Sequence, residues 1–115
     1  MFYQNMPLYL HLFNLLKIEY SYVHNLDKEY KYSLGEDAIN LSWKLLDLFV
    51  QAQTLSLGDE EKKKVISQIS LILEVLKLRI RFLTELKQLS LRQTANINRE
   101  LVEIGKMVGS WQKNV

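Results

Sequence analysis

The sequence predicts an all-α protein, an antiparallel up-down-up-down four-helix bundle that forms a single domain over residues 1–115. Apolar residues recur at three- and four-residue steps in four segments, which is the spacing of one face of a helix. Short polar links join these segments, and no segment alternates as a half-buried strand does. With 115 residues, of which 48% are hydrophobic, the chain can build one domain with one core.

The first helix is expected from Leu8 to about Asn25. Pro7 suits its first turn, because the N–H that proline lacks would have no partner there. Two apolar stripes run side by side along this segment, which is more apolar surface than one neighbouring helix needs. The polar, aperiodic stretch from Asn25 to Tyr32 is expected to be a connection.

The second helix is expected to start at a capping box, Ser33-Leu34-Gly35-Glu36, and to run to about Leu55. In such a box the Ser side chain accepts from the backbone N–H three residues on, and Glu36 reaches back to the first backbone N–H. Apolar residues keep strict four-three steps along this segment, as bundle packing requires. The stretch Ser56-Leu57-Gly58 ends the pattern.

The third and fourth helices are expected to be antiparallel neighbours, because only the short link Lys87-Gln88-Leu89 separates them. Asp59 is the expected N-cap of the third helix, which runs to about Leu86. A second capping box, Ser90-Leu91-Arg92-Gln93, starts the fourth helix, which continues to Lys113.

The composition argues against most kinds of enzyme and metal site. The chain has no Cys, and His11 and His24 lack partners at metal-ligand spacing. Glu100 and Glu103 are better explained as a solvated face than as an acid–base pair. No nucleophile with a base and no phosphate-binding Gly loop is recognisable. We therefore expect no catalytic residues, no metal and no cofactor.

The sequence also bears on location. Charged residues interrupt every apolar run before it could span a bilayer, and the N-terminus lacks the features of a secretion signal. We therefore expect a cytoplasmic protein without a membrane partner.

Positive charge gathers in the second half of the chain. The formal net charge is +2; residues up to Gly58 carry −2, so the remainder carries +4. In the fourth helix, cations recur at every seventh residue and should form one slowly drifting line. These four residues are Arg92, Arg99, Lys106 and Lys113.

Three further cations alternate with apolar residues late in the third helix. Lys77 and Arg81 should share a polar side, whereas Arg79 points toward the apolar side and needs a partner. An ion pair within the chain is the simplest partner, and an inter-subunit pair or a bound phosphate are the alternatives. The Lys62-Lys63-Lys64 run is interpreted as a solvated first turn.

Gly105 and Gly109 lie one turn apart on one side of the fourth helix. Each costs about 1 kcal/mol relative to Ala in a helix interior, so we expect a compensating close approach of another backbone. A tight crossing within the bundle is the simpler explanation, and a subunit or partner contact is the alternative.

The second half of the chain resembles a known family. The sequence Arg81-Phe82-Leu83, followed by the ending Glu103-Ile104-Gly105-Lys106-Met107-Val108-Gly109-Ser110-Trp111, resembles the accessory variability determinant (Avd) of diversity-generating retroelements. Tyr32-Ser33-Leu34-Gly35 resembles the start of helix two in the wider four-helix-bundle group, which includes proteins encoded in intervening sequences of large-subunit ribosomal RNA genes. The resemblance covers roughly Ser33 to Lys113.

The resemblance implies a basic homopentamer, a barrel of five bundles without enzymatic activity of its own. It implies association with a reverse transcriptase and with its template RNA or RNA/DNA hybrid, in support of mutagenic cDNA synthesis. The seven cations named above are then the candidate nucleic-acid contacts. The expected oligomer or packing contacts are Phe82, Gly105, Gly109 and Trp111.

An alternative hypothesis keeps the bundle and the oligomer but not the RNA. A protein of the ribosomal RNA intervening-sequence type could act as a protein-interaction or structural module whose cations serve solubility and ion pairing. Both hypotheses are compatible with the apolar surface of helices one and three, which exceeds what a lone bundle can bury and favours self-association.

Overall fold

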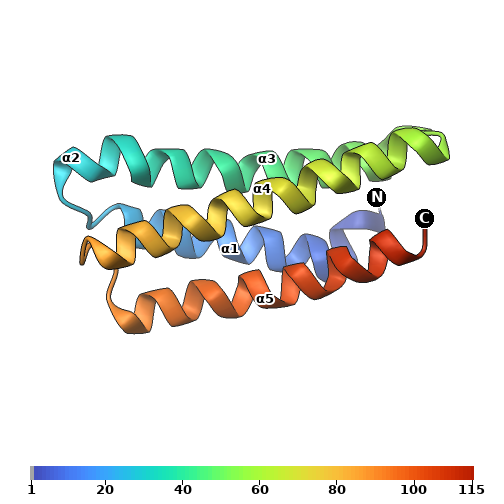
Figure 1. Ribbon diagram of the computed structural model, residues 1–115. Helices are drawn as coiled ribbons and strands as arrows, with labels where there is room; N and C mark the ends of the chain where they lie inside the picture. Colours follow the sequence, from blue (N-terminus) through green and yellow to red (C-terminus); the bar gives the residue numbers. More distant parts are fainter. Residues whose placement is uncertain (1) are drawn as a thin grey trace.

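Four long helices lie side by side in the computed structural model, which describes residues 2–115 (Figure 1). They are α1 (Pro7–Val23), α3 (Glu36–Thr54), α4 (Asp59–Glu85) and α5 (Leu91–Lys113). The shorter elements are η1 (Phe2–Asn5), α2 (Lys28–Tyr30) and the π-helical turn η2 (Lys31–Gly35). No strand occurs within residues 2–115, which confirms the predicted all-α class with four main helices.

The four helices form a ring in which each packs on two others. Helix α1 packs mainly on α3 and α5, and α4 packs on the same two helices, so α1 and α4 lie at opposite corners. The molecule is elongated, 44 × 23 × 22 Å along its principal axes. Among the described helices none is both long and apolar enough to cross a membrane.

The interior between the helices is filled by the apolar stripes that the sequence predicts. Each fully buried Leu, Ile or Phe contributes about 1.5–3 kcal/mol relative to an exposed position. The largest fully buried apolar side chains are Leu12, Leu15, Leu45, Phe49, Ile66, Ile69, Leu76, Leu83, Ile97, Leu101 and Ile104. All four long helices contribute to this list, so the chain has one continuous core.

Two polar side chains, Glu19 of α1 and Ser42 of α3, share this core. Glu19 is only 1% exposed, and burial raises the pKa of its carboxyl to about 8, with a smaller opposing effect of the Ser42 hydroxyl. No hydrogen bond joins the two groups. Both carboxyl oxygens of Glu19 and the hydroxyl of Ser42 are buried without a hydrogen-bond partner in the described structure. Desolvation therefore dominates, and Glu19 is mainly protonated at neutral pH.

The start of the second long helix differs from the prediction. The chain is already helical from Lys28, where the Lys31 N–H donates to the Asp27 carbonyl at 2.8 Å. Ser33 is therefore not an N-cap, and its hydroxyl donates to the Glu29 carbonyl at 2.7 Å, as Ser does inside a helix. The predicted capping box at Ser33 is wrong, and the predicted connection is largely helical.

The other predicted helix starts agree more closely with the structure. The capping box at Ser90 is confirmed, since Ser90 accepts from the Gln93 N–H at 3.1 Å and Gln93 accepts from the Ser90 N–H at 2.9 Å. At α4 the N-cap is Gly58 and Asp59 is the first helical residue, a shift of one position. Asp59 still lies in the first turn, where a carboxylate suits the helix dipole.

Helix α4 ends in a Schellman motif without a glycine. The Gln88 N–H donates to the Leu83 carbonyl at 2.9 Å, and the Lys87 N–H donates to the Thr84 carbonyl at 3.0 Å. Lys87 adopts a φ of 60°, the left-handed conformation that usually falls to Gly at this position. The turn reverses the chain directly into Ser90 and α5.

Candidate nucleic-acid and partner interface

The α5 cation line, Arg92, Arg99, Lys106 and Lys113, lies on the outer surface of α5. All four side chains are exposed, and they span about 30 Å of helix at 1.5 Å per residue. The opposite side of the helix holds α5 in place, because Ile97, Leu101, Ile104 and Val108 are buried in the core. One helix therefore carries both a buried seam and an exposed row of cations.

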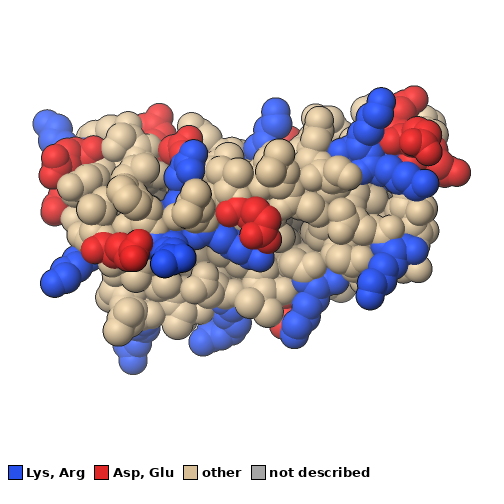
Figure 2. All heavy atoms as spheres, viewed as in Figure 1, with Lys and Arg blue, Asp and Glu red and all other residues tan. Residues whose placement is uncertain are grey.

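Figure 2 shows how charge is distributed over one face of the molecule. Lys and Arg atoms follow the lower edge, over α5 as placed in Figure 1, with few carboxylates between them. Most carboxylates in this view lie toward the two ends of the elongated molecule, and a further group lies near its middle, above the lower edge. This distribution creates a positive edge on a chain whose net charge is only +2.

The three predicted cations of α4 all have carboxylate partners within the chain. Lys77 Nζ lies 3.1 Å from Glu74 Oε1, and Arg81 Nε lies 3.9 Å from Glu85 Oε2. Arg79 Nε lies 2.7 Å from Oδ2 of Asp37 on α3, which is the intramolecular ion pair predicted as its simplest partner. These pairs leave α4 less free positive charge than its Lys and Arg residues suggest.

The α5 cation line is less neutralised. Lys106 Nζ lies 3.5 Å from Glu103 Oε1. Within residues 2–115, Arg92, Arg99 and Lys113 have no carboxylate oxygen within 4.0 Å. These three side chains can meet an external anion without first breaking an ion pair.

The predicted tight crossing at Gly105 and Gly109 is wrong for this chain. A Cβ on Gly105 would meet Leu73 Cδ2 at 3.7 Å, which is an ordinary contact, and one on Gly109 would meet nothing within 4 Å. No backbone approaches closely enough to require glycine at either position. The alternative, a contact with another subunit or partner, stays a prediction.

The two aromatic residues predicted for packing have different surroundings. Trp111 is half-buried at the end of α5, where its ring meets Phe49 edge-on with centroids 6.1 Å apart. Phe82 of α4 is exposed and lines an open groove with Leu34 and Leu78. Trp111 thus belongs to the fold of the chain, whereas Phe82 is available for contact with another molecule.

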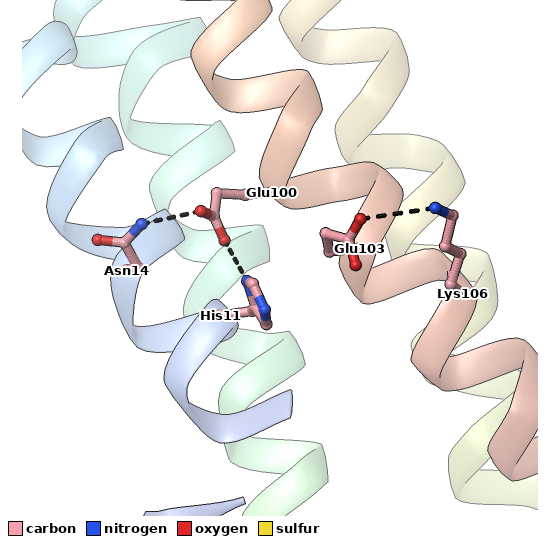
Figure 3. A network of polar contacts seen from close by, with 5 residues as sticks. All are labelled: His11, Asn14, Glu100, Glu103 and Lys106. Carbon is pink, nitrogen blue, oxygen red and sulfur yellow. Dashed lines mark hydrogen bonds and ion pairs between the residues drawn. The ribbon is translucent and has the colours of Figure 1, made fainter. Parts of the chain in front are cut away.

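The polar network that joins α1 to α5 is absent from the sequence prediction (Figure 3). Glu100 lies mostly buried between His11 Nδ1, 2.7 Å from its Oε2, and Asn14 Nδ2, which donates to its Oε1 at 2.9 Å. The prediction that Glu100 and Glu103 lie on a solvated face is therefore wrong for Glu100. Glu103 does point outward, toward Lys106. The sequence feature that could have indicated burial of Glu100 is its position directly before Leu101, a residue of the predicted apolar seam.

The described residues do not assemble the chemistry of a metal centre. Nowhere in residues 2–115 do three His, Asp or Glu side chains converge as metal ligands must. The carboxyl of Glu19, whose pKa burial raises to about 8, lies inside the apolar core rather than in a cleft. The surface features that remain are a row of cations and exposed apolar side chains, which suit binding.

Fold and surface describe a small four-helix protein whose last helix exposes a row of cations. The model of the bAvd-like family matches residues 10–115, nearly the whole chain. The chain therefore belongs to the bAvd-like family, which confirms the resemblance drawn from its sequence. Searches of curated proteins and of solved structures found no match.

Proposed function

We propose that this chain is a non-enzymatic, cytoplasmic accessory protein of a diversity-generating retroelement. It forms a homopentameric basic scaffold that binds the reverse transcriptase and its template RNA, or the RNA/DNA hybrid, and supports mutagenic cDNA synthesis. The observation that carries this proposal is the family match over residues 10–115 in a chain whose last helix exposes a line of cations. The remaining structural support concerns assembly and charge.

The proposed subunit is an antiparallel up-down-up-down bundle, five of which close into a barrel. Support for the helix directions comes from contacts that join the end of one helix to the start of the next. Tyr20, late in α1, accepts from Trp43 in the first half of α3, and Thr84, late in α4, lies 2.7 Å from Thr94 early in α5. Short links then suffice to join neighbouring helices.

Support for self-association comes from apolar side chains that the single chain leaves in water. They form stripes on α1 and α4, the two helices at opposite corners of the ring. The exposed members are Leu10, Phe13, Leu71, Leu78 and Phe82. Two different stripes on opposite corners favour a heterologous contact, in which one stripe of each copy covers the other stripe of the next copy. Such contacts close into a ring when the rotation from one copy to the next divides a full turn, and the proposed pentamer requires this rotation.

The proposed RNA contact is the α5 cation line, with Lys77, Arg79 and Arg81 of α4 as secondary contacts. Phosphate binding by exposed Lys and Arg needs no base recognition and releases counterions, so it weakens as salt rises. Arg92, Arg99 and Lys113 contribute first, since they have no competing carboxylate among the described residues. The α4 cations must exchange a carboxylate for a phosphate.

The salt dependence of RNA binding tests this surface. Template RNA is titrated with the wild type, with Arg92→Ala/Arg99→Ala and with a control, Lys44→Ala/Lys64→Ala, which removes the same charge from exposed positions elsewhere. Loss of two phosphate contacts should reduce the slope of log affinity against log salt by about 1.4, at about 0.7 per contact on a single strand. Equal slopes for all three proteins would refute the proposed surface.

The alternative function is a protein-interaction or structural module of the ribosomal RNA intervening-sequence type, without specific RNA binding. One observation favours it: four of the seven predicted cations, Lys77, Arg79, Arg81 and Lys106, lie within 4.0 Å of a carboxylate of the same chain. In that case the wild type would assemble but would not be retained with RNA on a filter at moderate salt.

A further inference from the structure

An open hollow of about 370 Å³ lies where the end of α1 meets η2 and the start of α3. It is at the end of the bundle where α2 is labelled in Figure 1. None of the seven cations proposed above lines it. Its volume is within the range of small-ligand sites, so it can hold a planar ring with part of its attached chain.

Two tyrosine rings flank the hollow, and each is both exposed and held by a neighbour. Tyr20 is 52% exposed, and its hydroxyl accepts from Trp43 Nε1 at 2.9 Å. Tyr32 is 64% exposed, and Lys31 Nζ lies 5.5 Å from its ring centroid. Rings that are already oriented lose little conformational freedom when another ring stacks on them.

The backbone beside the hollow has an unusual conformation that places these side chains there. Lys31 and Tyr32 belong to η2, and such single π-helical turns are rare and occur frequently at functional sites. Gly35 closes the turn against α1 and the loop after it. A Cβ at Gly35 would lie 2.8 Å from Val23 Cγ1 and 2.9 Å from Leu26 Cδ1. The absence of a side chain at Gly35 thus lets η2 approach the end of α1.

The chemistry of the lining selects among possible occupants. Among the described residues, the aliphatic ones that line the hollow are Val23 and Ile39, and both are buried. An amphipathic partner helix needs a longer aliphatic groove with pockets one turn apart. A planar ring with polar edges fits better, because Glu36 and Asn40 supply an acceptor and an amide at the rim.

We propose that this hollow binds a base of single-stranded RNA, stacked against Tyr32 and Tyr20. The Lys31 ammonium meets a flanking phosphate, while Glu36 and Asn40 meet the edge of the base. This inference rests on the proposed function for the identity of the polymer, but not on the α5 cation line. It adds a base-stacking site at a separate place on the chain.

The test compares two oligonucleotides of equal length and charge, a 12-mer homopolymer RNA and the same backbone without bases. The full-length wild type should bind the base-containing strand about tenfold more tightly, since stacking of a single base on an aromatic ring accounts for such a factor. Tyr32→Leu should lose this preference and keep its affinity for the abasic strand, whereas Tyr32→Phe should retain both. Tyr32 is exposed, so these variants should fold.

Two further measurements separate this site from the cation line. In Arg92→Ala/Arg99→Ala both strands should bind more weakly by the same factor, which leaves their ratio unchanged. In NMR spectra, addition of a nucleoside monophosphate should shift the Trp43 indole N–H, which bonds Tyr20, and leave that of Trp111 in place.

The outcomes are distinguishable. Equal binding of both strands by the wild type refutes the stacking site and leaves the cation line standing. Full-strength binding in Arg92→Ala/Arg99→Ala with a preserved base preference refutes the cation line and supports the stacking site. If Tyr32→Leu keeps the base preference but no longer captures the reverse transcriptase, the hollow binds protein and the inference is wrong.

Discussion

His11 Nδ1 on α1 lies 2.7 Å from Glu100 Oε2 on α5, a contact between residues that are 89 positions apart in the chain. Asn14 supplies a second hydrogen bond to the same carboxylate. Because Glu100 is mostly buried while its partners come from the first helix, the pair ties the two ends of the sequence together. The contact is one of the polar links between α1 and α5, beside the hydrogen bond that Asn96 Nδ2 donates to the Tyr22 hydroxyl at 2.8 Å, and it can be tested directly.

Glu100→Ala should lower the free energy of unfolding by about 1–2 kcal/mol, because it leaves two side-chain donors without their acceptor. Urea unfolding at a fixed protein concentration measures the change. Glu103→Ala on the same helix is the matched control, since its exposed pair with Lys106 should contribute at most about 0.5 kcal/mol. Equal effects of the two substitutions would show that the His11–Glu100 contact contributes no more than a surface pair.

The buried Glu19 should make stability depend on pH. Its pKa is about 8 in the folded chain and 4.5 as its ordinary value, so the folded state holds this proton more tightly. The stabilisation that comes from this tighter proton binding by Glu19 is fully present below pH 4.5. The free energy of unfolding should then fall by about 1.4 kcal/mol per pH unit as the pH rises from 4.5 toward 8. Glu19→Gln should remove this fall and be the more stable protein at pH 8.

Unfolding measured at several pH values for the wild type, Glu19→Gln and Glu74→Gln checks this prediction. Glu74 is exposed, so its substitution should leave the wild-type pH profile unchanged. A wild-type profile that coincides with that of Glu19→Gln would mean that Glu19 is not held protonated in the core.

Lys87→Gly should stabilise the chain by about 0.5–1 kcal/mol. Lys87 has a φ of 60°, which costs a residue with a Cβ about 1–2 kcal/mol, and the greater freedom of glycine in the unfolded state offsets part of the gain. Thermal unfolding gives the measurement. Lys87→Ala is the control, because alanine keeps the strain and should show no comparable gain.

Gly35→Ala and Gly109→Ala should have opposite effects. A methyl group at position 35 would overlap Val23 and Leu26, so Gly35→Ala should lower the free energy of unfolding by about 1–3 kcal/mol. At position 109 a methyl group would meet nothing within 4 Å. Gly109→Ala should therefore raise the free energy of unfolding of the single chain by up to about 1 kcal/mol.

The same Gly109→Ala variant bears on assembly. If the α5 glycines face another copy, the added methyl group should weaken the oligomer while it strengthens the helix. Size-exclusion chromatography over a dilution series measures this. Oligomers as stable as those of the wild type would exclude Gly109 from the subunit contact.

Much of the fold was predictable because helix positions follow local patterns. The apolar periodicity identified all four long helices, and the capping box at Ser90 depends only on residues three apart. The box at Ser33 was misassigned because the same letters also fit a helix interior, where the hydroxyl of Ser33 bonds to Glu29 instead. A contact with a residue distant in sequence supports the earlier start of this helix, because the Asp27 N–H donates to Gln88 Oε1 at 2.9 Å.

The candidate site was predictable in part for the same reason. Heptad spacing alone placed the α5 cation line on one surface, whereas the neutralisation of Arg79 depends on Asp37, 42 residues earlier in the chain. The tyrosine-lined hollow depends on a π-helical turn and on Gly35 meeting α1, neither of which has a local sequence signal. Contacts between distant segments set these features, and a single sequence does not specify such contacts.

The proposed function depends on the assembly of this chain into a ring-shaped scaffold that binds RNA. Multi-angle light scattering at micromolar concentration, with and without template RNA, tests it most directly. We expect a particle of about five times the 13.6 kDa chain mass that gains mass when RNA is added. A stable 13.6 kDa monomer whose mass does not change with RNA would contradict it.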